Sequence, residues 1–437
     1  MRRKIILFSV MTIFMTIFSY FFTIVNGDEL WNYGFSYNIV KGAIPYKDFN
    51  MVLLPLYSLI MAIPLRFIGN NLFVYHLSNA IFICSILTIV DNNKTFNTIC
   101  LFLFITLESF VYGYNCFIMT LLILALYLEN SKYKYKNELI GIVLGCILAT
   151  KQNIGIMLFI PYILHSKEKI KSICYYLIPI TITIIYLIFN DALFECIDYC
   201  FLGLKNFNSN FIIKSPIFII IIIILIIFLI NRYRKTKDIN YLYLLFFLTI
   251  NYPLFEIFHF MIGIIPLVYY LLEKENNYYL NMVLYSFPIV IICLAYIHPI
   301  ITNGLYLSNI DVYKYRNVGE NVDSESIKIV NFIGDNSNPK IFNFTLYSYF
   351  VKIAMDKKID KFDLINKGNM GSNEEKYIED IDKTCRNKKC LFLINEYIFE
   401  AYGSQTNPII KDYVINNYEF CKNITHSNSL YCKKKTE

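Results

Sequence analysis

Long apolar runs separated by short polar turns make up the first 300 positions of the chain. One of them, SPIFIIIIIILIIFLIN at 215–231, has about the length that a helix needs to cross the hydrocarbon core of a bilayer, roughly 17 to 25 residues. Further runs of this kind follow one another as far as residue 299. The pattern predicts an α-helical polytopic membrane protein.

The first run has a basic head. The stretch MRRKIILFSVMTIFMTIFSYFFTIVNG continues from that head into an apolar core of about 20 residues. It lacks the small-residue cleavage site of a secretory signal peptide. We therefore expect a retained first span over 5–25, with the N-terminus in the cytoplasm.

Three basic clusters indicate which turns face the cytoplasm, because lysine and arginine are enriched in cytoplasmic loops. The clusters are KYKYK at 132–136, KEKIK at 167–171 and RYRKTK at 232–237. If 51–69 and 72–90 both crossed the membrane, all three clusters would lie outside. We predict that only 72–90 crosses, and that 51–69, which contains Pro55, Pro64 and Arg66, lies in the outer interface.

On this count about eleven spans cross the membrane, and the last, about 278–299, brings the tail to the outside. Residues 1–299 then form a transmembrane domain, with 26–71 as its first outer loop, and residues 300–437 form an extracytoplasmic domain. The tail is rich in Asn, Asp, Lys and Ser, and its apolar stretches are short. We expect a small α/β domain, with PKIFNF and CLFLIN as strands and SESIKIVNFIG and NPIIKDYVINNY as helices.

Composition excludes an ordinary soluble domain, since 56% of the 437 residues are hydrophobic and only 17% are charged. The formal charge of +7 comes with basic residues clustered between apolar runs. Orientation of the helices explains these clusters. We therefore expect membrane lipids, and no nucleic acid, as partners.

The twelve cysteines fall into two groups. Eight lie scattered in the membrane region without metal-ligand spacing and are read as small apolar residues. The tail holds the other four, Cys385, Cys390, Cys421 and Cys432. Two disulfides between neighbours in sequence, or four free thiols, both fit this even number.

The hairpin from Glu138 to His165 is too short for two full spans. Its 28 residues leave 13 or 14 for each leg, against the roughly 20 of a standard span, so the turn TKQN must lie below the outer surface. A lysine at membrane depth costs roughly 2.5 to 3.5 kcal/mol on insertion scales. Lys151 therefore either extends to the lipid headgroups or meets an anion such as a phosphate, with Gln152 adding hydrogen bonds.

Other polar residues gather at the same outer turns. Each has a structural alternative: Glu108 can cap a helix, and Glu256 and His259, three residues apart, can form a polar pair on one helix face. Their shared depth favours a common cavity with several carboxylates and at least one cation. The residues come from separate hairpins and are Asp28, Glu29, Glu108, Lys151, Glu256 and His259; Asn115 begins the span after Glu108.

A cavity of this kind, with apolar walls, suits an amphiphile that carries a phosphate and a polar head. Lys151 would bind the phosphate, and a carboxylate would take a proton from an attacking hydroxyl. A sugar linked to a lipid phosphate meets these requirements.

The first outer loop, DELWNYGFSYNIVKGAIPYKDFNMVLLPLYSLIMAIPLRFIG, resembles the opening loop of GT-C membrane glycosyltransferases. The branch it resembles contains protein O-mannosyltransferases and lipid A aminoarabinose transferases. Its matching residues are Asp28, Glu29, Gly42, Pro45, Tyr46, Asp48, Phe49, Pro55 and Gly69. GIVLGCILATKQNIG is similar to the family's glycine-rich fifth span, and FEIFHFMIGIIP resembles a late span.

The resemblance covers about the first 300 residues. It implies transfer of a sugar from a polyprenyl-phosphate donor to an acceptor outside the membrane, with inversion. It makes Asp28 the general base, Glu29 its neighbour and Lys151 the ligand of the donor phosphate. The family's second outer loop often holds an Arg-x-Asp pair; this chain has ESFVYGYN, in which Glu108 is the candidate replacement. This departure leaves a requirement for a divalent metal open.

Several alternatives stay open at this point. Asp28 is also a good N-cap for the helix that follows, and Trp31 is either an interfacial anchor or a surface for a sugar to stack on. Asp48, Asn115 and His259 complete the candidate substrate-binding residues. A transporter or lipid-linked flippase, and a scaffold that displays the tail, are the alternative functions.

Overall fold

The computed structural model describes the chain in segments that form two compact units. The helical unit comprises Met1–Ile24, Phe73–Thr183 and Phe211–Asn309, and the mixed unit comprises Val25–Leu72, Ile184–Asn210 and Ile310–Glu437. The described residues are 2–22, 27–92, 94–107, 113–203, 212–213, 216–252, 254–255, 257–274, 324–335, 339–345, 348–363, 365, 369–386, 388–395, 408–426 and 428–434. The predicted last span, 278–299, lies outside them.

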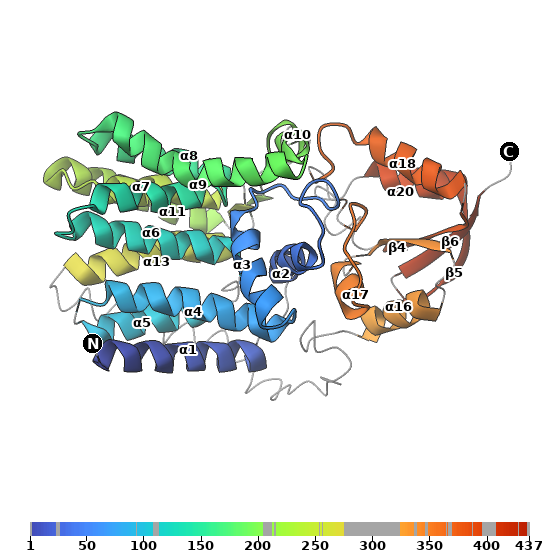
Figure 1. Cartoon of the computed structure of the whole chain (residues 1–437), viewed down its shortest axis with the longest axis horizontal. Helices are drawn as coiled ribbons and strands as arrows, with labels where there is room; N and C mark the ends of the chain where they lie inside the picture. The colour runs from blue at the N-terminus through green and yellow to red at the C-terminus, as the bar shows by residue number, and fades with distance from the viewer. Residues whose placement is uncertain are drawn as a thin grey trace. The chain divides into compact units, whose positions relative to one another are not determined.

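Long helices make up the helical unit, and Figure 1 shows them side by side. They are α1 (Arg2–Phe22), α4 (Leu72–Val90), α5 (Thr95–Leu107), α6 (Tyr114–Asn130), α7 (Lys136–Leu148), α8 (Gln152–His165), α9 (Lys169–Phe189), α11 (Pro216–Thr236), α12 (Asn240–Phe247) with the 3₁₀ turn η3 (Leu248–Asn251), and α13 (Ile257–Lys274). Strand β1 (Ile212–Ile213) pairs in parallel with β2 (Leu254–Phe255). Helices α1 and α4 coincide with the predicted spans 5–25 and 72–90, and α11 coincides with the apolar run 215–231. Two helices, α4 and α9, satisfy both the length and the hydropathy expected of a membrane helix.

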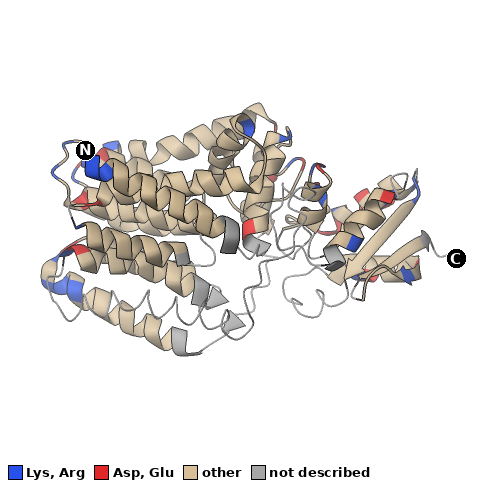
Figure 2. Ribbon diagram, turned by 90° about the horizontal axis from the view of Figure 1, so that it is seen from below, with Lys and Arg blue, Asp and Glu red and all other residues tan. Residues whose placement is uncertain are grey.

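Arg3 at the start of α1 forms an ion pair with Asp91, just after α4, with 2.6 Å between Nη2 and Oδ2. The start of α1 and the end of α4 therefore lie at the same end of the unit. This placement agrees with the prediction that 51–69 does not cross, which stays a prediction, and the helix there, α3 (Leu56–Phe67), belongs to the mixed unit. In Figure 2 most of the lysines and arginines of the helical unit lie near the end where the chain begins.

The hairpin of α7 and α8 has the short legs that the sequence predicts, 13 and 14 residues. At 1.5 Å per residue each spans about 20 Å, well short of a 30 Å hydrocarbon core. Glycines let neighbouring helices pack closely here: a Cβ on Gly145 of α7 would collide with the backbone of Tyr176 in α9, and one on Gly155 of α8 would collide with Leu148 of α7. The turn between α7 and α8, which carries Lys151, is thus held by a tight packing of backbones.

The mixed unit joins the outer loops to the tail. Its first parts are α2 (Gly27–Val40), α3, α10 (Leu193–Ile197) and the π-helix η1 (Asp198–Leu202). The tail contributes α16 (Ser324–Asp335), β3 (Lys340–Phe344), α17 (Ser348–Ala354), α18 (Glu375–Arg386), β4 (Cys390–Asn395), α20 (Pro408–Asn417), β5 (Tyr418–Asn423) and β6 (Asn428–Lys434). The strand order is β3-β4-β6-β5, with β3 and β4 parallel and the other pairs antiparallel.

The predicted α/β tail is thereby confirmed, with both predicted strands and both predicted helices in place. Phe342, Phe344 and Phe392 of the central strands form the core with apolar residues of α18 and α20. In Figure 1, α18 and α20 cover one face of the sheet, while α16 and α17 lie on the other. The β5–β6 hairpin was not predicted, because YEFCKN is exposed over five of its six positions and shows no apolar alternation.

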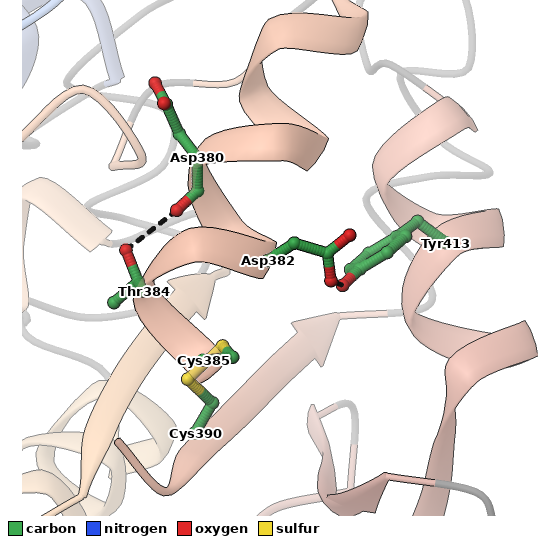
Figure 3. Close-up of a disulfide and its surroundings, with 6 residues drawn as sticks. All are labelled: Asp380, Asp382, Thr384, Cys385, Cys390 and Tyr413. Carbon is green, nitrogen blue, oxygen red and sulfur yellow. Dashed lines mark hydrogen bonds between the residues drawn. A yellow bond between two sulfur atoms is a disulfide. The ribbon is translucent and has the colours of Figure 1, made fainter. Parts of the chain in front are cut away.

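Of the two alternatives left open for the tail cysteines, the structure has the disulfides between neighbours in sequence, Cys385–Cys390 and Cys421–Cys432. The first joins the end of α18 to the start of β4, and the second joins the paired strands β5 and β6. Figure 3 shows Cys385–Cys390 together with Asp382, which accepts a hydrogen bond from Tyr413 of α20. The disulfides therefore reinforce contacts that the sheet and helices already make.

Candidate functional site

Lys151 lies in the helical unit at the turn between α7 and α8, and only 9% of it is exposed. Its Nζ donates a hydrogen bond to Asn115 Oδ1 at 3.0 Å and lies 5.2 Å from the centre of the Tyr114 ring. Thr150, the residue before it, donates from Oγ1 to the carbonyl of Cys146 at 2.9 Å and so closes the end of α7. The structure thus joins two residues, Lys151 and Asn115, that the sequence proposed separately.

The N-termini of two helices, α6 and α8, lie beside this lysine. Lys151 is the N-cap of α8, and Asn115 stands in the first turn of α6, which has Gly113 as its N-cap. Neither N-cap, a glycine and a lysine, has a side-chain acceptor for the first-turn N–H groups of its helix. The N-terminus of a helix carries a partial positive charge and outward-facing N–H groups. A buried ammonium group beside two such termini is an arrangement that favours an anion.

Helix α2 of the mixed unit carries the two acids of the first outer loop. Asp28 follows Gly27, where the helix begins, so it lies inside the first turn rather than at the predicted N-cap position. Glu29 is buried, with 3% exposed, and Asn32 and Ser36 on the same helix are buried as well. Trp31 is half-buried. A carboxylate in the first turn interacts favourably with the helix dipole. Asp28 and Glu29 therefore lie where the helix stabilises their negative charge.

The loop after α2 contains motif residues of the first outer loop, and its backbone geometry gives several of them a structural role. Gly42 and Tyr46 adopt positive φ angles of 79° and 68°. Asp48 accepts a hydrogen bond from the backbone N–H of Ile44 at 2.7 Å, and Tyr46 N–H donates to Phe49 at 2.8 Å. The Asp48 carboxylate therefore has a definite structural task, closing this turn.

The remaining predicted residues fall in several places. Gln152 is buried in the first turn of α8, and His259 is half-buried in the first turn of α13. Glu108 and Glu256 lie outside the described residues, as does the side chain of Asp28. Among the described residues, no group of three or more His, Cys, Asp or Glu side chains is arranged to hold a metal ion.

Sequence reasoning missed His76 and Asn79 of α4, which are 2% and 3% exposed. They are three residues apart, so they share a helix face, and they lie in the half of α4 that begins at Leu72. A histidine within a run as apolar as 72–90 is itself a signal, since ionisable residues in membrane helices are rare and often functional. The sequence also gave no indication of the asparagines Asn38 and Asn50, described below.

Two solved structures share this architecture over nearly the whole chain. ArnT from Cupriavidus metallidurans bound to undecaprenyl phosphate has a TM-score of 0.56 and 9% sequence identity, covering 98% of this chain and 97% of that chain. The chain is similar in fold to ArnT. The apo state of the same protein has a TM-score of 0.51 and 8% identity, with the same coverage of both chains.

At these identities the likeness to ArnT concerns the fold alone. It supports the GT-C-like architecture that the first outer loop suggested. No protein-family model and no curated protein matches the sequence.

Proposed function

We propose that the protein is a membrane glycosyltransferase, which moves a sugar from a polyprenyl-phosphate donor to an acceptor on the extracytoplasmic side. The observation that carries this proposal is the buried Lys151, bonded to Asn115 at the start of two helices. An anion with a long apolar tail suits such a site between membrane helices. The GT-C-like fold, shared with an ArnT bound to undecaprenyl phosphate, supports the same donor class.

In the proposed reaction, Lys151 binds the donor phosphate with Asn115 and Gln152, and His259 lies at the start of a neighbouring helix. The acceptor hydroxyl attacks the anomeric carbon of the sugar as the bond from that carbon to the phosphate oxygen breaks. The hydroxyl proton passes to a carboxylate, for which Asp28 is the first candidate. Polyprenyl phosphate leaves with its charge stabilised by Lys151, and a single displacement inverts the anomeric centre.

The other proposed residues assist this step. Glu29 neighbours the base, and Glu108 is the candidate for the second acid. Trp31 offers a ring on which the sugar can stack, and Asp48 shapes the loop that carries these residues. The proposed domains are a transmembrane catalytic domain over 1–299 and an extracytoplasmic domain over 300–437, in a multi-pass protein of the cell membrane with its N-terminus in the cytoplasm.

The alternative functions lack a comparable observation. A transporter of the broken-helix type has paired discontinuous helices in two related halves, and the sequence shows no such repeat. A scaffold that displays the tail does not require a buried lysine in the helical unit.

The decisive experiment is transfer of radiolabel. Membranes containing the protein are incubated with a panel of radiolabelled polyprenyl-phosphate sugars, and label is followed into wall polymer, lipid and protein fractions. We expect label to move with the native chain and not with Lys151→Met. Label that moves equally with both, or binding of donors without any transfer, would contradict the proposal.

A further inference from the structure

The mixed unit contains a set of bonds that neither the fold nor the proposed chemistry accounts for. They connect α2 and the loop after it with residues 356–363 of the tail, which we name the latch. The two segments are more than 300 positions apart in the sequence. Every residue involved belongs to the mixed unit.

Asn38, in the last turns of α2, makes the most specific of these bonds. Its Nδ2 donates to the carbonyl of Ile359 at 2.8 Å, and its Oδ1 accepts from the N–H of the same residue at 2.9 Å. The side chain is fully buried. Both halves of the amide are thus matched to the N–H and carbonyl of a single residue of the latch, which needs a side chain that both donates and accepts.

Further bonds follow along the latch. Asn50, also fully buried, donates to the carbonyl of Lys361 at 2.7 Å. At the other end Asp356 accepts from Tyr37 Oη at 2.8 Å and forms an ion pair with Lys41 at 2.5 Å. The latch is therefore held to α2 and its loop at three successive points.

Close packing seats the same helix on the tail. Tyr349 of α17 is buried against α2, and a Cβ on Gly34 would collide with its ring. The rings of Tyr349 and Phe35 meet edge to face at 5.9 Å. Gly34 is needed here for the close approach of the ring rather than for a special backbone conformation.

The tail also contacts the latch through ion pairs. Lys352 of α17 lies 3.1 Å from both Asp360 and Asp363, and Lys340 of β3 lies 3.2 Å from Asp360. Lys361 pairs with Asp380 of α18. Ion pairs with three tail elements thus surround the carbonyl and N–H groups that Asn38 and Asn50 contact.

We infer that the latch fixes the position of α2, and through it the two acids in the first turn of α2, so that Asn38 is a positioning residue for the transfer reaction. The inference rests on the proposed function. Helix α2 is 14 residues long and moves as a rod, so a shift at Asn38 is passed on to Asp28. Misplacing a reacting group by about 1 Å can cost on the order of 100-fold in rate.

The first test compares Asn38→Ala with Asn417→Ala in the full-length protein. Asn417 is a matched control, because its amide bonds only within its own helix, to the carbonyl of Tyr413. For Asn38→Ala we expect kcat to fall at least tenfold, while Kd for undecaprenyl phosphate stays within twofold. Amide hydrogen exchange in 30–40 should become faster. Asn417→Ala should change none of these quantities.

The second test restores the connection by other means. In an Asn38→Cys/Ile359→Cys variant, a disulfide formed by mild oxidation should join the two buried positions and recover most of the kcat lost in the reduced protein. A folded variant in which the cross-link forms without any recovery would overturn the inference, as would an Asn38→Ala protein with native kcat.

The two tests separate this inference from the proposed function. If the native protein transfers no sugar, the proposed function fails and the exchange measurement alone decides whether the latch holds α2. Unchanged exchange in 30–40 would then reject the latch. If the native protein transfers sugar but Asn38→Ala changes only thermal stability, the proposed function stands and Asn38 is not a positioning residue.

Discussion

Lys151 Nζ and Asn115 Oδ1 lie 3.0 Å apart, although the two residues are 36 positions apart in the sequence. The contact brings together the N-termini of α6 and α8 around one buried cation. Since each terminus carries a partial positive charge, the lysine adds to a set of groups that can bind a phosphate.

We therefore expect Lys151→Met to weaken binding of undecaprenyl phosphate roughly 10- to 150-fold, the range that corresponds to a hydrogen bond to a charged group. The melting temperature in the absence of ligand should change much less than the affinity, because methionine fills a similar volume. Binding is measured by titration of the purified protein in detergent, and melting in the absence of ligand.

The matched control is Lys94→Met. Lys94 Nζ donates to the carbonyls of Leu272 and Glu273 near the opposite end of the helical unit. This variant should bind undecaprenyl phosphate like the native protein. A Lys151→Met protein with native affinity and a lowered melting temperature would show that the lysine is structural.

The sequence predicted the features that depend on length and hydropathy. The short legs of α7 and α8 follow from the 28 residues between Glu138 and His165, and Lys151 was placed by the same count. The motif of the first outer loop also predicted the fold. Its residues Gly42, Tyr46 and Asp48 build a turn whose positive φ angles and side-chain hydrogen bond few other residues allow.

The sequence could not predict contacts that depend on distant segments. Asn38 and Asn50 appear as ordinary polar residues until Ile359 and Lys361 are brought to them. Strand β5 owes its existence to pairing with β6 rather than to its own residues. The mixed unit as a whole joins three separated stretches of chain, for which no local pattern exists.

The parity of the helices predicts which loops are accessible from outside the cell. Lys134→Cys lies in the KYKYK turn and Lys376→Cys on α18 of the tail, and both positions are exposed. A membrane-impermeant maleimide added to intact cells should label the second and not the first. After permeabilisation both should be labelled. Labelling of position 134 alone in intact cells would reverse the predicted orientation.

The latch region should make stability depend on pH. Burial, and the nearby Asp360 carboxylate, raise the pKa of Asp363 to about 7. Between about pH 4 and pH 7 the folded protein therefore holds a proton that the unfolded chain has released. Because the folded state binds more protons, its free energy of unfolding falls as the pH rises through this window.

Asp363→Asn provides the comparison, since the amide cannot titrate. Thermal melting of the full-length protein from pH 4 to pH 8 should show a downward slope with rising pH that is smaller in this variant. Lys352, whose pKa is raised by the neighbouring carboxylates, stays charged throughout the window. Equal slopes for the two proteins would show that Asp363 is ionised in the folded state at all these pH values.

The last prediction concerns Asp28, in the first turn of α2. If it accepts the proton of the acceptor hydroxyl, Asp28→Asn should lower kcat roughly 10²- to 10⁴-fold, the usual contribution of a positioned base. Stability should change by less than about 1 kcal/mol, the typical value of a carboxylate at a helix N-terminus. The two quantities to measure, on the same preparation, are kcat at saturating donor and acceptor and the free energy of unfolding.

Glu29→Gln is the matched control for Asp28→Asn. Glu29 is the next residue along the helix, so its side chain points about 100° away around the axis and cannot occupy the same position. It is buried, so its substitution should affect stability more and turnover less than Asp28→Asn does. A folded Asp28→Asn protein that transfers sugar at the native rate would exclude Asp28 as the base. If Glu29→Gln instead produced the large loss of kcat at native stability, the base would be reassigned to Glu29, on the same helix and held by the same latch.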